Sequence, residues 1–435
     1  MPGPMKSSPQ GGDRTDRLMS WAALAGCALL FLAIPLRAPL MLFDLLAPLM
    51  VWQAWRKRRE WTEALDLGHP LAWLILASGW VLLSSVLQHF RGGAPFYDTA
   101  IFLYLPLAAL FYYVTPLPDA RICARTGAIL LGLCLLAFLL GGRLGGALAE
   151  RLFYTEEHLV ASGEALARRF QFLFTNPNLL GSAFALPLLL LLPALQRRLE
   201  TGTPKTWLLT ALALLAACLP LLATASKHLL LSFGLCLGLL AASPPLRRFG
   251  RKAAPSLTAA AGLLMALTVW FRTYPALHEP PWIDFHGRSN YSTHQEVYLD
   301  IIAHEGPAGW AWGHAGDELR RLYPAHADPD KIAAILEPYY GHGLDEIFAT
   351  FMDPHNEYLN TASLFGIPAL LLYLAAALCL CRNALREGNT PALCLLVALA
   401  FACLWDDLAS KRWVWLYLGL LMRRPPEAQI ARDGK

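Results

Sequence analysis

Long apolar runs alternate along this chain with polar segments, most of which are short. A helix needs about 20 predominantly apolar residues to cross a hydrocarbon core about 30 Å thick. We therefore expect an all-α integral membrane protein, with residues 1–435 forming a single polytopic domain. Residues 1–17 are polar and are expected to form a disordered cytoplasmic N-terminus. The pattern predicts twelve transmembrane helices, at residues 18–36, 38–55, 70–89, 96–115, 122–141, 177–195, 206–223, 226–242, 256–272, 361–381, 391–405 and 412–422.

The longest polar segment, residues 273–360, separates the ninth predicted span from the tenth and holds eight of the twelve histidines. A capping-box pattern of Thr293 with Glu296 predicts a helix that ends near His304. Acidic capping residues predict a second helix over residues 328–340. Both helices carry stripes of aliphatic and aromatic residues, so we expect them to lie along the membrane interface.

Lysine and arginine gather in alternate loops, which sets the orientation by the positive-inside rule. The basic loops and termini include Arg56-Lys-Arg-Arg59, Arg197-Arg198 and Arg423-Arg424. Both termini are then cytoplasmic, and the 273–360 loop is external. The net charge of +4 is mostly this orientation signal, so nucleic-acid binding is not indicated. None of the nine cysteines lies in an external loop, and no disulfide is predicted.

Polar residues stand at the openings of two predicted spans. Asn176-Pro-Asn178 opens the sixth span, where asparagine caps a helix and proline fits its first turn. The alternative is that these amides bind a sugar or a phosphate. Lys227 begins the eighth span, where its ammonium either extends to the lipid headgroups or faces a lipid-linked phosphate.

The external loop adds an arginine and a glycine- and tryptophan-rich segment. Arg288 offers a planar fork that suits phosphate oxygens, although a loop arginine is usually solvated. Gly306-Pro-Ala-Gly-Trp-Ala-Trp-Gly-His314-Ala-Gly316 implies tight turns with exposed aromatic rings. Those rings would either stack on sugars or simply anchor the loop.

Asp353-Pro-His355-Asn-Glu357-Tyr358 opens the tenth predicted span. If Asp353 or Pro354 starts the helix, His355 lies in the first turn. The positive end of the helix dipole then disfavours the imidazolium. A neutral imidazole can accept a proton near pH 7, so His355 is the candidate general base. The ordinary alternative is a structural histidine.

Acidic pairs raise the alternative of a divalent metal ion. Asp328-Pro-Asp330 and Asp406-Asp407 are such pairs, but a helix cap or a turn explains each of them. The histidines show neither HExxH nor CxxC spacing, and the chain has no dinucleotide or P-loop pattern. We therefore predict no metal site and no cofactor.

Together these motifs resemble the O-antigen ligase/polymerase superfamily of bacterial membrane glycosyltransferases, over about residues 176–412. His355-Asn-Glu-Tyr-Leu359, with Phe365-Gly366 behind it, carries most of the resemblance. The resemblance implies a GT-C-type fold in the inner membrane with a periplasmic catalytic loop. Chain length and loop size look most like the ligases, which transfer a glycan from undecaprenyl pyrophosphate to a lipid A–core sugar. Polymerases of O-antigen repeats and pilin oligosaccharyltransferases share the motif.

The resemblance also implies roles for individual residues. The family's catalytic histidine corresponds to His355, and its loop arginine, which would bind the donor pyrophosphate, to Arg288. Lys227 stands where the family usually has arginine. Other basic residues that could bind the pyrophosphate are Arg168, Arg169 and Arg272. Residues that would bind sugar or support the site are Asn176, Asn178, His314, Glu357 and Tyr358.

The chemistry implied is a single displacement that inverts the anomeric carbon, needs no metal and uses His355 as the base. The rival class is a transporter of a lipid-linked sugar. Buried charges in mid-span would favour transport, and Asp44 is the main candidate for such a charge.

Overall fold

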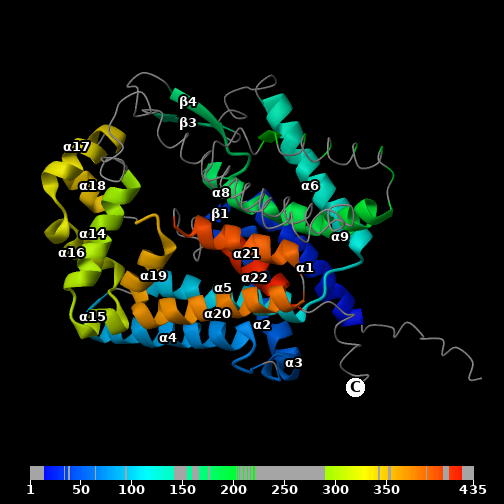
Figure 1. Ribbon diagram of the computed structural model, residues 1–435, viewed down its shortest axis with the longest axis horizontal. Helices are drawn as coiled ribbons and strands as arrows, with labels where there is room; N and C mark the ends of the chain where they lie inside the picture. Colours follow the sequence, from blue (N-terminus) through cyan, green and yellow to red (C-terminus); the bar gives the residue numbers. More distant parts are fainter. Residues whose placement is uncertain are drawn as a thin grey trace, which may run out of the picture.

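A computed structural model describes most of the chain, apart from residues 221–289 and several shorter stretches. The described ranges are 14–33, 35–37, 40–63, 65–93, 96–141, 154–158, 166–174, 177–201, 290–340, 343–350, 354–387, 389–404 and 411–423, with isolated positions from 203 to 220. Within these ranges the protein is predominantly helical, with two short antiparallel hairpins (Figure 1).

The N-terminal half contains the first set of helices and both hairpins. Its elements are α1 (Arg14–Leu32), β1 (Pro35–Arg37), β2 (Leu40–Met41), the 3-10 helix η1 (Leu42–Leu46), α2 (Ala47–Arg56), α3 (Arg58–Thr62), α4 (Pro70–Phe90), α5 (Phe96–Val114), α6 (Ala120–Gly141), β3 (Tyr154–His158), β4 (Leu166–Phe170), α8 (Pro177–Ala183) and α9 (Ala185–Thr201).

The elements of the C-terminal half are all helices among its described residues. Its elements are α14 (Asn290–His304), α15 (Pro307–Trp312), α16 (Gly316–His326), α17 (Pro329–Tyr340), α18 (Leu344–Thr350), α19 (Glu357–Phe365), α20 (Ile367–Arg386), α21 (Thr390–Ala402) and α22 (Arg412–Met422).

Among the described residues, four helices are long and apolar enough to cross a membrane: α1, α4, α6 and α20. The apolar stretch 179–195 and α22 are shorter. The prediction of a helical protein with membrane spans is therefore confirmed at this level. Twelve spans and a GT-C-type arrangement stay predictions. The expected spans 226–242 and 256–272 lie outside the described residues, as do residues 1–13 and most of 206–223.

Two predicted spans differ from the structure in how they begin. The span expected at 38–55 becomes helical only at Leu42, because residues 40–41 pair with β1 in a hairpin. The span expected at 361–381 is two helices, since α19 ends at Phe365 and α20 starts at Ile367. Gly366 between them has φ +85°, which favours glycine, and Pro368 suits the first turn of the new helix.

The segment 142–176, between two predicted spans, contains the antiparallel hairpin β3–β4 among its described residues. Its register sets Glu156 opposite Arg168 and Thr155 opposite Arg169. Alternating residue types in a stretch this short fit a strand as well as a helix.

The long helices pack side by side around an aromatic core (Figure 1). α4 packs on α5 and α20, α22 packs on α5, and α6 packs on α9. Buried hydroxyls in this core donate to helix carbonyls: Tyr112 Oη to Ala23 O (3.0 Å) and Tyr417 Oη to Ser182 O (3.0 Å). A polar group buried this deeply is costly unless it is hydrogen-bonded, so these bonds fix how the helices pair.

Ionic and polar contacts mark the two ends of the helix bundle. At one end, Asp44 of η1 and Arg412 at the start of α22 form a mostly buried, bidentate ion pair at 2.7 and 2.8 Å. At the other end, Asp16 near the start of α1 pairs with Arg56, the last residue of α2. There too, Arg423 after α22 donates to the carbonyl of Thr115 after α5. The N-terminal end of α1 and the C-terminal end of α22 therefore lie on the same side.

Helices α14, α16, α17 and α18 form a separate cluster at one end of the bundle, which we call the cap (yellow-green in Figure 1). Its core contains Val297, Tyr298, Ile301, Leu319, Tyr323, Ile332 and Ile347. The apolar stripes of α14 and α17 face this core. The stripes therefore pack against each other, and the position of these two helices at the membrane interface stays a prediction.

The cap is joined to the bundle where α15 and α19 meet α4. The side-chain amide of Gln88 on α4 donates to the carbonyls of Trp312 (2.9 Å) and Leu364 (2.6 Å). Trp80 of α4 stacks on Trp312, with ring centroids 4.7 Å apart. Gly366 touches the backbone of Ala311 so closely that a Cβ would overlap its carbonyl. The described part of the 273–360 loop is thus held against α4 by hydrogen bonds to backbone carbonyls and by ring stacking.

Candidate functional site

His355 lies at the junction between the cap and the bundle, just before α19. Its backbone has φ +45°, in the left-handed region, and its side chain is half-buried. The expectation that it occupies the first helical turn is wrong. Asn356 caps the helix instead, with its Oδ1 accepting from the backbone N–H groups of Tyr358 (3.0 Å) and Leu359 (3.2 Å). Non-glycine residues with left-handed backbone store strain and are concentrated at functional sites.

A second histidine faces His355 from the first turns of α14. The rings of His294 and His355 are 6.3 Å apart between centroids, at an interplanar angle of 69°. His294 is fully buried, and its Nδ1 lies 2.7 Å from the hydroxyl of Tyr323 on α16. Burial, and secondarily the neighbouring His355, lowers the pKa of His294 to about 3. His294 is therefore uncharged at neutral pH.

The uncharged state of His294 predicts that acid destabilises the fold. Its folded pKa lies below its ordinary value of about 6.5, so the unfolded chain binds the extra proton as pH falls from 6.5 toward 3. Between pH 7 and pH 5 this proton uptake by the unfolded chain lowers the free energy of unfolding by about 2 kcal/mol. Denaturant unfolding of purified protein, followed by circular dichroism, should show this loss. His294→Gln, which can still hydrogen-bond Tyr323, should show less of it, and equal losses in the two proteins would contradict the assignment.

Glu357 and Tyr358 contact α19 itself and the end of α21. Glu357 is buried, its carboxylate accepts from Thr361 Oγ1 (2.6 Å), and its N–H donates to the carbonyl of Cys403 (2.8 Å). The hydroxyl of Tyr358 donates to the carbonyl of Ala400 (2.6 Å). These contacts tie the start of α19 to the end of α21. Of the two expected roles, they favour support of the site over direct sugar binding.

His314 also has a supporting position. It is 7% exposed, and its backbone N–H donates to the carbonyl of Ser363 on α19 (2.8 Å). Its ring lies between two carboxylates, with Nε2 3.6 Å from Glu305 and Nδ1 3.3 Å from Glu318. Nδ1 makes no hydrogen bond to the described residues, although a Glu318 oxygen lies 3.3 Å away. His314 holds the cap against the helix that His355 precedes.

The two tryptophans of the glycine-rich segment have different environments. Trp312 is used as an anchor by its stacking on Trp80. Trp310 is 44% exposed, while its Nε1 donates to the carbonyl of Ile302 (2.6 Å). A fixed indole with an exposed face suits stacking on a flat ligand, whereas Trp312 serves as an anchor.

Most of the predicted phosphate-binding cations fall outside the described residues. Lys227, Arg272 and Arg288 lie there, and so does Asn176. Arg168 and Arg169 are described as backbone positions on β4, and α8 begins at Pro177 as the Asn-Pro pair predicts, with Asn178 in its first turn. The meeting of these cations with His355 therefore stays a prediction.

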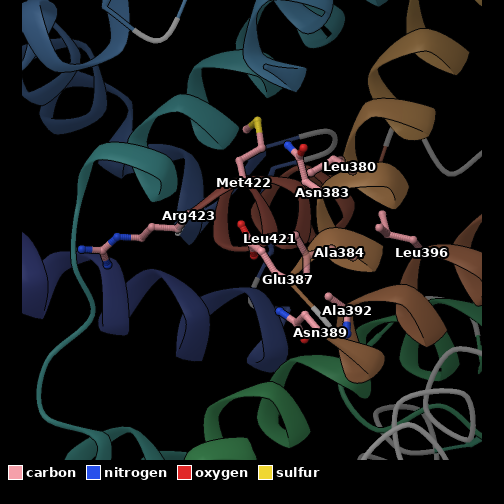
Figure 2. A pocket seen from close by; sticks show the side chains of 10 residues that line it. All are labelled: Leu380, Asn383, Ala384, Glu387, Asn389, Ala392, Leu396, Leu421, Met422 and Arg423. Carbon is pink, nitrogen blue, oxygen red and sulfur yellow. Dashed lines mark hydrogen bonds between the residues drawn. The ribbon is translucent and has the colours of Figure 1, made fainter. Parts of the chain in front are cut away.

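The pocket drawn in Figure 2 is far from His355. It is lined by the ends of α20 and α22, including Asn383, Glu387, Asn389 and Arg423. Glu387 follows the last residue of α20, whereas His355 precedes α19, which leads into the start of α20. At 1.5 Å per residue the length of α20 alone separates them by about 30 Å. None of the residues that line this pocket is a histidine, and we place the candidate site at His355.

Sequence reasoning missed His294 and Tyr323 as site residues. A signal for His294 was present, because it precedes Val297, Tyr298 and Ile301 at three, four and seven positions. That spacing sets it on the buried face of a helix. Its partners come from another helix and from the start of α19, and neither pairing has a signature in local sequence.

No family model matches this chain, and no curated protein matches it either. Assignment of its chemistry therefore rests on its own residues and on the geometry around His355.

Proposed function

We propose that this protein is a bacterial inner-membrane glycosyltransferase of the O-antigen ligase type. It would transfer a glycan from undecaprenyl pyrophosphate to a sugar hydroxyl of lipid A–core on the periplasmic face. In this proposal both termini are cytoplasmic, and the cap, together with His355, is periplasmic. In this orientation the Asp44–Arg412 pair is at the periplasmic end of the bundle and the Asp16–Arg56 pair is at the cytoplasmic end. The positions of the two pairs at opposite ends agree with that alternation.

The observation that carries the proposal is the position of His355. A partly exposed imidazole on left-handed backbone, beside a fully buried and uncharged histidine, lies where the cap meets the bundle. A solvent-reachable imidazole can remove a proton, whereas His294 is enclosed and can only position. Trp310, exposed on α15 where the cap joins the bundle, adds a candidate surface for stacking on a sugar.

The proposed step is one displacement at the anomeric carbon. The acceptor hydroxyl oxygen forms the new glycosidic bond while the bond from carbon to the pyrophosphate oxygen breaks. Undecaprenyl pyrophosphate leaves with the electron pair, and the hydroxyl proton goes to His355. Fixed cations stabilise the charge that builds on the leaving oxygen. Arg288 is the favoured cation, because it lies two residues before α14, whose first turns carry His294.

The central test uses purified protein in detergent with undecaprenyl-pyrophosphate-linked glycan. Added lipid A–core should become glycosylated if the protein is a ligase. Lengthening of the donor glycan without added acceptor would make it a polymerase instead, and labelling of a pilin acceptor would make it a protein glycosyltransferase. Movement of the lipid-linked sugar across sealed vesicles with no new glycosidic bond would replace the whole proposal with transport.

Arg288→Ala is expected to weaken use of the donor. Loss of a charge-assisted, bidentate contact to a phosphate removes about 1.5–3 kcal/mol of binding, or roughly 10–150-fold in kcat/KM for the donor. Arg288→Lys should keep part of the activity, because it keeps the charge and loses the fork. Lys227→Ala should have a smaller effect of the same kind.

The matched control for these variants is Arg320→Ala, an exposed arginine on α16 of the same loop. Initial rates at several donor concentrations separate donor binding from turnover. Normal donor dependence in Arg288→Ala, equal to that of the Arg320 variant, would remove Arg288 from the phosphate site.

A further inference from the structure

Two histidines and an aspartate meet at the ends of two cap helices, away from His355. Asp300 and His304 are one turn apart on α14, and His326 is the last residue of α16. The Nδ1 of His304 lies 3.1 Å from Oδ1 of Asp300, and the Nδ1 of His326 lies 2.9 Å from Oδ2. All three ligand atoms lie within 4.8 Å of one another.

These separations are close to those of a metal site. Two ligands at about 2.0–2.1 Å from a tetrahedral ion lie about 3.3 Å apart, which small side-chain movements provide here. One carboxylate and two imidazoles are a ligand set that zinc commonly takes, with water in the fourth position. Their spacing in sequence, D-x-x-x-H followed by a histidine 22 residues on, escapes a search for HExxH or CxxC.

The backbone around the cluster also favours a cation. His304 is the last residue of α14 and His326 the last residue of α16. The C-terminal end of a helix carries partial negative charge from unpaired carbonyls, so an ion here would lie beside two such ends.

We propose that Asp300, His304 and His326 bind a divalent transition-metal ion of the zinc class, which joins the end of α14 to the end of α16. The ion is accessory to glycan transfer. His304 is ten residues along α14 from His294, about 15 Å at 1.5 Å per residue. It would hold together the two helices that carry His294 and Tyr323, and it does not depend on the proposed function.

The test is zinc binding to purified protein that carries no histidine tag. The full chain in detergent is treated with EDTA, exchanged into chelator-free buffer and titrated with Zn²⁺ by calorimetry, with Co²⁺ as a spectroscopic probe of coordination geometry. We expect one tight site per chain, a tetrahedral Co²⁺ spectrum and a rise in the thermal unfolding temperature on adding Zn²⁺.

His304→Ala and His326→Ala should each weaken this site by at least about 100-fold and abolish the Zn²⁺-dependent rise in unfolding temperature. The His304 side chain is 67% exposed, so its removal leaves the packing of α14 intact and this variant decides the question. His89→Ala, at an exposed histidine on α4, is the matched control and should bind like the unmodified protein. Absence of a tight site, or equal binding by the His304 and His89 variants, would show that the cluster is only a pair of Asp–His ion pairs.

Discussion

His355→Ala is expected to lower the rate of glycan transfer by about 10²–10⁴-fold, the usual contribution of a general base. The acceptor hydroxyl is a poor nucleophile until its proton is removed, so losing the imidazole slows the bond-forming step and leaves substrate binding largely unchanged. The measurement is the initial rate with purified protein, donor and acceptor, at saturating donor. Full activity in this variant would remove His355 from the mechanism.

The left-handed backbone at residue 355 requires a second variant. Alanine at φ +45° is strained, so part of its effect can come from the backbone before Asn356. Asparagine tolerates this conformation far better but has no basic nitrogen. His355→Asn should therefore be as inactive as His355→Ala and as stable as the unmodified protein. Recovery of activity with asparagine would instead assign to residue 355 a role in shaping the turn.

Two helix starts in the C-terminal half were predictable from the sequence. Asp328 accepts from the backbone N–H groups of Asp330 (3.1 Å) and Lys331 (3.3 Å), and α17 begins at Pro329 as expected. α22, which has no side-chain cap, begins at Arg412, where the apolar run of the last span was predicted to start. Such signals lie within a few residues of the structure that they specify.

Contacts between distant segments were not predictable in this way. The side-chain amide of Gln88 on α4 donates to carbonyls more than 200 positions away, and the sequence near residue 88 does not indicate those partners. The break at Gly366 had a signal in the Gly-Ile-Pro368 run, which an emphasis on hydropathy overrode. For the candidate site, His355 was found from its motif, whereas its position before the cap and its contact with His294 required the fold.

Removing Asp44 is expected to have the largest effect on stability. Its carboxylate makes a bidentate pair with Arg412, and both side chains are about one-tenth exposed, at 11% and 12%. Breaking a buried pair from one side leaves an uncompensated charge and costs about 3–5 kcal/mol. Asp44→Asn should therefore lower the denaturant midpoint of the purified protein markedly. Glu60→Ala, which breaks the exposed pair with Lys57, should change it by less than about 1 kcal/mol.

The double variant Asp44→Leu/Arg412→Met tests whether the instability of Asp44→Asn comes from an unpaired charge or from altered packing. Because it removes both charges together, it should recover most of the stability lost in Asp44→Asn. A double variant as unstable as the single one would contradict this account, as would an Asp44→Asn protein no less stable than Glu60→Ala.

The ion pair also bears on the candidate site. Arg412 is the first residue of α22, and residues 405–410 precede Lys411. Just before this segment, two backbone carbonyls accept hydrogen bonds from residues of the candidate site and of α14. Cys403 O accepts from the N–H of Glu357, and Leu404 O accepts from the side chain of Gln295 (3.3 Å). Loss of the pair should thus lower stability and glycan transfer together, with transfer recovering in the double variant. His355→Asn should abolish transfer at unchanged stability. Measuring both quantities in both variants separates a residue that performs the reaction from one that holds the framework around it.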